Sequence, residues 1–426
     1  MAEASLSQDP HRDRAKEGGF IARIAWRNLW RNKRRTWLTA GGIAFASFLV
    51  IFSNAMQVGV YGSMIENATG LLEGHIQITH PNYPDDTKLE QTVLGATELV
   101  RLLEQVPGIE VAPRAEAYAL MSVGERSFGG LVVGVDFERE KQVVAFFRQI
   151  ALGRLPVGDE EVLLGGTMAR NLGVGIGDEV VALGSAKQGG VAAMALRVVG
   201  IFNSGQAEID RSLMFTTLSN VQNAFALGDE VHKLVIRATD PQNLNQEIER
   251  IERTIGDDWL VRSWERFMAE LKQSIELDSI GGDLVFGSLL IIVCFSVVNT
   301  FMMVVFERKR EFGMLLAVGM QSGLIVRQVL AEAFFMWVVG VSIGLGIALI
   351  LITWLSFEGI SIADMGMEGL DEMASMFFMS DRLYPAISVG SLVFSPLVLL
   401  IGTQLAGLIA MFRIRKIQPV EALRGE

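Results

Sequence analysis

The charged residues that could recognise a partner are gathered in one short segment, Phe306 to Gly319, which reads FERKREFGMLLAVG. Five charged residues of both signs come first: Glu307, Arg308, Lys309, Arg310 and Glu311. Three apolar residues follow: Leu315, Leu316 and Val318. The pattern predicts a short helix lying across the membrane normal, with its ends at Gly313 and Gly319, that offers a cytosolic protein an apolar knob ringed by charges. A plain amphipathic connector, whose positive charges only set the topology, is an equally good interpretation.

The chain offers no pattern that is typical of catalysis or metal binding. The four histidines, His11, His75, His80 and His232, lack metal-ligand spacing. No serine, histidine and aspartate arrangement indicates a nucleophile, and no phosphate loop of the form GxxxxGK[ST] occurs. We therefore expect no catalytic residue, no metal and no cofactor in this chain.

Four long apolar runs must position the charged segment. They are Trp37–Gly62, Leu284–Phe306, Ala333–Phe357 and Leu383–Phe412. The predicted span that contains the third run begins a few residues earlier, at residue 328. Each exceeds the roughly 20 residues that span a bilayer. We expect an α-helical membrane protein with four transmembrane helices, at 37–62, 284–306, 328–357 and 383–412, and one large α+β domain at 63–279.

The distribution of charge predicts the topology. Residues 1–36, the 307–327 turn and the tail 413–426 hold 17 basic and eight acidic residues, whereas residues 63–279 hold 19 basic and 32 acidic. Basic residues collect in short cytoplasmic segments. Both termini and the 307–327 turn are thus expected in the cytoplasm, and the domain and the 358–382 loop outside it.

The large domain reads as two similar flanks around a different middle. Alternation predicts strands at 75–79, 109–123, 127–135, 233–237 and 259–261, with helices at 97–105 and 241–255. The section at about 150–230 is dense in glycine, which favours hairpin turns and a β-rich lobe. We expect a porter-like lobe with an inserted β-rich lobe.

Residues 20–35, FIARIAWRNLWRNKRR, predict an amphipathic helix in the membrane interface. Its apolar face carries Ala22, Ala25, Trp26, Leu29 and Trp30, and its basic face carries Arg23, Arg27 and Arg31. A merely basic stop before the first span is the alternative.

Three features within the spans need an interpretation. Asp283 and Glu332 lie at span ends, where a structural role is favoured, with Arg327 a nearby partner. Gly340, Ser342, Gly344 and Gly346 favour close helix packing. Two apolar stripes could line a cavity for a lipid-anchored cargo, or could simply face lipid or neighbouring spans: Phe45, Phe48, Phe52 and Met56 in the first span, and Leu290, Val293, Val297 and Phe301 in the second.

The 358–382 loop is rich in methionine, and Leu370, Met373 and Phe377 share one helical face. Methionine makes adaptable apolar surfaces. The residues fit a short surface helix that contacts acyl chains or cargo, or equally a cap on the large domain.

The run ERKREFGMLLAVGMQSGLIVRQVLAE resembles the signature of FtsX/MacB-type ABC transporter permeases. Three other segments are similar to the same family: RNLWRNKRRTWLTAGGIA, GRLPVGDEEVLLGGTMARNLGVGIGDEV and IRKIQPVEALRGE. The resemblance covers essentially the whole chain in the expected order. Without a fused ATPase, the chain resembles the LolC/LolE lipoprotein-releasing branch.

The resemblance implies a coupling helix that docks into a separate ATPase subunit, which would bind ATP and magnesium. The positions matching that helix are Glu307, Arg308, Arg310, Glu311, Gly313, Ala317 and Gly319. It also implies a bacterial inner-membrane location, a periplasmic domain, and a homodimer or heterodimer of permeases whose first two spans form the interface. Membrane lipids and a lipoprotein or other amphiphile are the expected partners, and nucleic acid is not.

Three functions are compatible with these parts. The first is extraction of lipoprotein or lipidic cargo from the outer leaflet. The second is MacB-like efflux of peptides or amphiphiles by mechanotransmission. The third is FtsX-like signalling to a cell-wall hydrolase. An enzyme is the fourth reading, and no residue constellation favours it.

Overall fold

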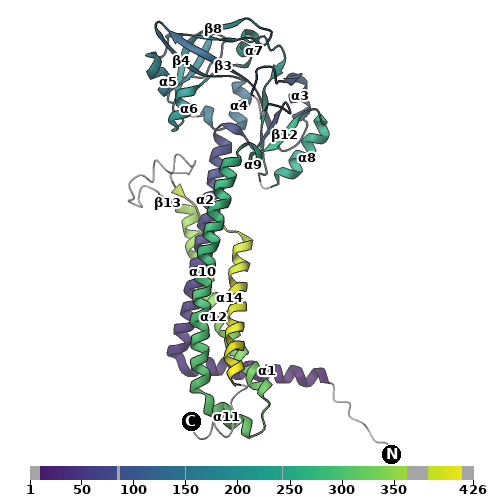
Figure 1. Ribbon diagram of the computed structural model, residues 1–426, viewed down its shortest axis with the longest axis vertical. Coiled ribbons are helices and arrows are strands. Elements are labelled where there is room, and N and C mark those ends of the chain that lie inside the picture. Colours follow the sequence, from purple (N-terminus) through teal and green to yellow (C-terminus); the bar gives the residue numbers. More distant parts are fainter. Residues whose placement is uncertain (1–9, 84–86, 149, 242, 362–381, 415–426) are drawn as a thin grey trace, which may run out of the picture. The chain divides into compact units, whose positions relative to one another are not determined.

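The computed structural model describes residues 10–83, 87–148, 150–241, 243–361 and 382–414 (Figure 1). These residues form two compact units. The helical unit comprises residues 10–61, 276–361 and 382–414, and the α/β unit comprises the described residues of 62–275. The boundaries at 61/62 and 275/276 fall inside two continuous helices, α2 and α10.

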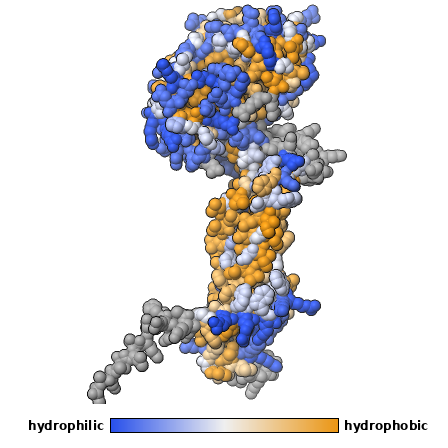
Figure 2. Space-filling view, turned by 180° about the vertical axis from the view of Figure 1, so that it is seen from behind, coloured by the Kyte–Doolittle hydropathy of each residue, from blue (hydrophilic) through white to orange (hydrophobic). Residues whose placement is uncertain are grey.

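Long helices make up the helical unit. They are α1 (Pro10–Leu29), the 3-10 turn η1 (Trp30–Asn32), α2 (Lys33–Ala68), α10 (Ala269–Glu307), α11 (Lys309–Ala317), α12 (Ser322–Glu358) and α14 (Val389–Ile414), with a short strand pair β13 (Ile360–Ser361) and β14 (Arg382–Leu383). Within the described residues, four helical stretches are long and apolar enough to cross a membrane. Many of their large apolar side chains are exposed, among them Phe45, Ile292 and Ile350, as expected of a surface that faces lipid. Figure 2 shows this hydrophobic surface.

Small residues let α12 approach α2 closely. A Cβ added at Gly340 would lie 2.7 Å from Ile43, and one at Gly344 would lie 2.3 Å from the Ala44 carbonyl oxygen. The prediction of close packing is confirmed for these two glycines. At Gly346 an added Cβ would meet no atom within 4 Å, so this glycine serves no such contact.

The predicted flanks of the α/β unit pair with each other in one antiparallel arrangement. Strands β1 (Ile76–Thr79), β3 (Ile109–Val123), β11 (Lys233–Ala238) and β12 (Leu260–Ser263) lie in the order β12-β1-β11-β3. Helices α3 (Ala96–Leu103) and α8 (Leu244–Ile255) pack against this group, with Leu103 and Ile251 fully buried. The chain order β1-α3-β3-β11-α8-β12 is thus a split βαβ motif. The predicted strands and helices of both flanks are confirmed.

The middle section contains helices as well as strands. Its strands are β5 (Leu152–Gly153), β6 (Glu161–Gly165), β7 (Glu179–Ser185), β8 (Val191–Phe202) and β9 (Leu213–Thr217), and its helices are α5 (Gly166–Leu172), α6 (Ala207–Ser212) and α7 (Leu218–Ala224). The hairpin interpretation of its glycines holds for Gly189 and Gly190, which join β7 to β8 with positive φ. Glycine is needed at position 165 for a different reason. A Cβ there would lie 2.2 Å from the Asp210 carbonyl oxygen.

Both sections belong to a single hydrogen-bonded sheet. Its order is β12-β1-β11-β3-β4-β9-β6-β8-β5, with β7 pairing β3 and β8. The long strand β3 pairs with β11 at one end and with β4 (Arg126–Val135) and β7 along the rest. The remaining elements are η2 (Thr69–Glu73), the pair β2 (Val93–Leu94) and β10 (Glu230–Val231), α4 (Phe137–Val143), η3 (Phe146–Arg148) and α9 (Trp264–Phe267).

Candidate functional site

A single residue, Arg308, separates the end of α10 from the start of α11, and α11 stops in a glycine cap. The Met320 amide donates to the Leu315 carbonyl at 3.0 Å, and the Gly319 amide donates to the Leu316 carbonyl at 3.0 Å. Gly319 has φ +96, so this is a Schellman cap that favours glycine. Gly319 therefore ends the helix as predicted, whereas Gly313 does not. Gly313 is a buried residue within the helix.

Arg308, in the turn between α10 and α11, is the centre of an ionic cluster. Its guanidinium donates to Glu332 of α12 at 3.0 and 3.1 Å and to Glu311 of α11 at 2.9 Å. The Glu332 side chain is 8% exposed, and Asn28 of α1 also donates to it at 3.0 Å. The partner of Glu332 is thus Arg308, not the predicted Arg327, because α11 folds back and brings residue 308 beside α12.

Two further ion pairs link the elbow between α1 and α2 to the same place. Arg31 lies 2.7 Å from Glu311, and Arg35 lies 2.6 Å from Glu307. Arg31 and Glu311 are largely exposed, so this pair contributes little stability by itself. Together the contacts join α1, α10, α11 and α12 through side chains that are up to 304 residues apart in sequence.

Arg308 and Glu311 stay charged near neutral pH. The hydrogen bond from Arg308 keeps the pKa of Glu311 below its ordinary value. Burial lowers the pKa of Arg308, but Glu332 and Glu311 outweigh burial and raise it overall. The Arg308 guanidinium also lies over the Phe312 ring, 5.0 Å from its centroid. These contacts hold the charges of Arg308 and Glu311 in place.

The outer face of α11 differs from the predicted knob. Val318 is 84% exposed and Met314 is 59% exposed, while Ala317 and Arg310 are also exposed. Leu315 and Leu316 are partly buried and pack against the core of the helical unit. Of the predicted apolar knob, only Val318 lies on the open face, and Met314 joins it. Such a mixture of exposed apolar residues and fixed charges is suited to docking against a protein surface.

The structure divides the seven predicted coupling positions into two groups. Glu307, Arg308 and Glu311 form ion pairs within the helical unit, and Gly313 is buried. Arg310, Ala317 and Gly319 lie on the exposed side. Sequence reasoning missed Asn28 and Arg35 as members of the cluster, and placed Arg31 only on a lipid-facing basic side. An acidic residue in an apolar helix, Glu332, was the signal that could have indicated it.

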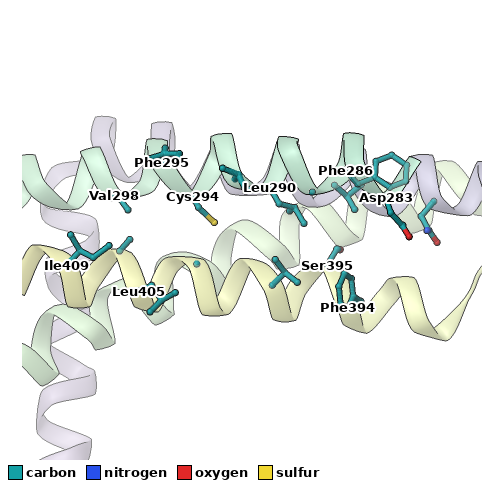
Figure 3. A pocket seen from close by; sticks show the side chains of 17 residues that line it. Asp283, Phe286, Leu290, Cys294, Phe295, Val298, Phe394, Ser395, Leu405 and Ile409 are labelled. Carbon is teal, nitrogen blue, oxygen red and sulfur yellow. The ribbon is translucent and has the colours of Figure 1, made fainter. Parts of the chain in front are cut away.

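A pocket of about 620 Å³ lies among α2, α10 and α14 (Figure 3). Of the eight predicted cavity residues, Leu290 alone lines it. Val297 and Phe301 are buried in the core of the helical unit, and Val293 packs against that core. Phe48 and Phe52 stack with ring centroids 5.8 Å apart and pack against Ile51 and Ile352. Phe45 is 61% exposed, and Met56 is partly exposed.

The predicted surface-loop residues, Leu370, Met373 and Phe377, lie outside the described residues. Their role stays a prediction. The same holds for most of the tail segment IRKIQPVEALRGE.

The α/β unit contains a second ionic cluster, which is closed to solvent. The Arg114 guanidinium donates to Glu140 at 2.6 and 2.8 Å, and both residues are fully buried. Nearby, Lys233 lies 2.6 Å from Glu116, and the Tyr83 hydroxyl donates to Glu116 at 2.8 Å. His232 accepts from the Glu116 amide at 2.9 Å through Nδ1. Because these groups pair with one another inside the fold, they hold the strands of the sheet together.

Comparison with known proteins matches the two parts of the chain to two family models. Residues 36–254 match the MacB-like periplasmic core domain, and residues 284–419 match the FtsX-like permease C-terminal domain.

Relatives of similar length share low identity over most of the chain. A lipoprotein-releasing system transmembrane protein LolC of Neisseria meningitidis is 23% identical over 405 residues, covering 92% of this chain and 94% of the relative. A LolC of Xylella fastidiosa is 24% identical over 323 residues, covering 74% and 77%.

Among solved structures, the periplasmic region of MacB from Actinobacillus actinomycetemcomitans aligns with a TM-score of 0.36 at 17% identity. It covers 50% of this chain and 97% of that one. The extracellular domain of YknZ from Gram-positive bacteria aligns with a TM-score of 0.32 at 11% identity, covering 45% and 99%.

Proposed function

Because the chain belongs to the FtsX/MacB-type family of ABC transporter permeases, we propose that it converts ATP hydrolysis in a separate subunit into motion of its α/β unit. The ATPase would bind ATP and magnesium, and this chain would supply no catalytic residue. The chain would lie in a bacterial inner membrane, with both termini and α11 in the cytoplasm and the α/β unit in the periplasm.

The observation that carries the proposal is the exposed face of α11, made by Met314, Val318 and Arg310. Exposed apolar residues beside charges that are already fixed by ion pairs favour a protein partner, since little side-chain order is lost on docking. Seven positions of this segment match the family's coupling helix: Glu307, Arg308, Arg310, Glu311, Gly313, Ala317 and Gly319.

The ionic cluster suggests how a push on α11 would travel. Arg308 joins α11 to α12 through Glu332, and Arg31 joins α11 to the elbow before α2. Displacement of α11 must therefore move those helices or break the pairs. Helices α2 and α10 run without interruption into the α/β unit, which supports a mechanical route between the two units.

We propose that the cargo is a lipoprotein or a related lipidic molecule, taken from the outer leaflet of the membrane. Support comes from the LolC-named relatives, which align over most of their length and of this chain. We further propose that two permease copies, identical or different, act with two ATPases. A hydrophobic cargo path along the predicted stripes of α2 and α10 belongs to this proposal and is tested with it.

The proposal predicts that a charge on the open face of α11 abolishes coupling. Val318→Asp should prevent co-purification of the ATPase subunit and ATP-driven release of a lipoprotein from proteoliposomes. A matched control is Val191→Asp, since Val191 is 78% exposed at the start of β8 in the α/β unit. Val191→Asp should leave ATPase association unchanged. Normal association of the Val318→Asp protein would contradict the proposed docking face.

MacB-like efflux is the second candidate function, because residues 36–254 match the MacB-like periplasmic core domain. The same proteoliposomes separate the two functions. ATP-dependent release of a membrane-anchored lipoprotein favours extraction. Transport activity that affects only soluble peptides or small amphiphiles favours efflux and overturns the lipoprotein assignment, while leaving the coupling helix intact.

A further inference from the structure

The pocket among α2, α10 and α14 has an apolar interior and one charged residue. Apolar and small residues from α10 and α14 line most of it, including Phe286, Leu290, Cys294, Leu405 and Ile409. Figure 3 shows Phe286, Leu290 and Cys294 on one helix facing Phe394, Leu405 and Ile409 on another. Asp283 lies at one end of the pocket and supplies the one ionisable group of its lining other than the Cys294 thiol.

Asp283 is exposed and forms no hydrogen bond or ion pair with any residue that the structure describes. It directly precedes Leu284, where the apolar run of α10 begins. In a membrane this is the depth of the lipid head groups, where a carboxylate is tolerated. The pocket therefore has a negative group at head-group depth and an apolar channel that leads from it toward the bilayer interior.

The dimensions fit a chain molecule. On α10 the lining runs from Asp283 to Val298, which at 1.5 Å per residue is roughly 22 Å. The pocket, at about 620 Å³, lies within the usual range for a small-molecule site.

We infer that this pocket binds one acyl chain of a membrane phospholipid whose head group carries an ammonium ion, with Asp283 as the counter-ion. The carboxylate attracts the ammonium of phosphatidylethanolamine and repels the net negative head group of phosphatidylglycerol. The bound lipid is a resident of one permease copy, so the inference does not depend on which cargo the transporter moves.

Two glycines provide a matched pair of substitutions. Gly287 lines the pocket, and a Cβ added there meets no atom within 4 Å, so a leucine at this position would fill the pocket without a clash. Gly346 of α12 has the same open surroundings but does not line the pocket. Asp283→Asn keeps the size of the side chain and removes its charge.

The test is native mass spectrometry of the full chain in detergent with dioleoyl phosphatidylethanolamine or dioleoyl phosphatidylglycerol. The wild type should retain one phosphatidylethanolamine with a two- to fivefold preference over phosphatidylglycerol, about the range for one partly exposed ion pair. Asp283→Asn should retain lipid without preference, Gly287→Leu should lose it, and Gly346→Leu should behave as the wild type.

Equal retention of both lipids by the wild type would overturn the head-group assignment. Unchanged retention by Gly287→Leu would overturn the location. If the wild type retains no lipid and Gly287→Leu shifts dimers to monomers, a second copy covers the pocket and the inference is wrong. Lipoprotein release is measured separately, so failure of the cargo proposal leaves these outcomes interpretable.

Discussion

The two ionic clusters connect distant parts of the chain in opposite ways. In the α/β unit, Arg114 and Glu140 form a two-contact pair that is fully buried. In the helical unit, one guanidinium nitrogen of Arg308 donates to both oxygens of Glu332 and another donates to Glu311. Exposure in this cluster rises from the buried Glu332 to the largely exposed Arg31. A buried pair cannot separate without leaving a charge in the protein interior, whereas water can replace the partner of an exposed one. The first cluster is thus suited to holding a fold, and the second to rearranging during a cycle.

The largest expected effect follows from removing Arg114 from its buried ion pair with Glu140. Arg114→Met leaves Glu140 without a counter-ion and should lower the free energy of unfolding of the α/β unit by about 3–5 kcal/mol. Chemical denaturation of the full chain measures this loss of stability. The other tryptophans are replaced in every variant, so that the fluorescence reports Trp259 and Trp264 alone. The double variant Arg114→Met with Glu140→Leu should recover much of the loss. A loss below about 1 kcal/mol would remove the contrast between the clusters.

An intermediate effect is expected at Glu332, the most buried acidic residue of the ionic cluster in the helical unit. Glu332→Gln keeps the hydrogen-bonding shape but removes the charge that faces Arg308, and should weaken the attachment of α11 to α12 by about 1–3 kcal/mol. Hydrogen exchange of the Lys309–Ala317 amides reports the opening of α11. Glu311→Gln, which leaves the Arg308–Glu332 pair in place, should have a smaller effect. Equal effects of the two variants would show that burial does not rank these contacts.

The pH dependence of the closed cluster has a definite sign. Burial lowers the pKa of His232 below its ordinary value, although Glu116 opposes this, so the folded chain keeps the imidazole neutral. As the pH falls below about 6.5, the unfolded chain binds a proton that the folded chain refuses, and stability is lost. Above that pH the imidazole is neutral in both the folded and the unfolded chain, and this loss of stability does not occur.

Hydrogen exchange of β11 between pH 7.5 and 5.5 measures this loss. In the His232→Gln variant, the free energy of opening of β11 should change less steeply with pH than in the wild type. Some slope should remain, because burial also lowers the pKa of His75. An identical slope in the variant and the wild type would assign the pH dependence to other groups.

The smallest effect is expected at the exposed edge of the open cluster. Arg31→Ala removes a pair whose side chains are 61% and 44% exposed, and should cost about 0.2–1 kcal/mol. The difference from the wild type in α11 exchange should vanish at ~1 M salt, where the Debye length is about 3 Å. Arg23→Ala, which changes an exposed arginine of α1, is the control. A salt-independent loss would indicate that Arg31 acts through packing.

Local patterns predicted the elements well and their partners poorly. Hydropathy and alternation identified the long apolar helices and both flanks of the sheet, because period and length are properties of a contiguous segment. The glycine stop at Gly319 was correct for the same reason. Gly313 was wrong as a helix end, because α11 continues through it from Lys309 to Ala317.

Long-range contacts were the part that one sequence could not supply. The Glu332–Arg308 pair joins residues 24 positions apart, and Asn28 meets Glu332 across 304 positions. No local pattern distinguishes Arg308 from Arg327 as a partner. The predicted cavity residues stay a prediction. Every membrane helix has an apolar stripe, and the packing of α14 decides which residues of α10 border this pocket.

The fifteen residues of β3 have a practical consequence for anyone who divides this protein. A fragment restricted to residues 150–230 would separate β9 from β4 and β7 from β3, and would leave those strands with unpaired amides and carbonyls. Bare strand edges of that kind recruit other chains. Expression trials should therefore cut outside β1 and β12, so that every strand of the sheet keeps its native partners.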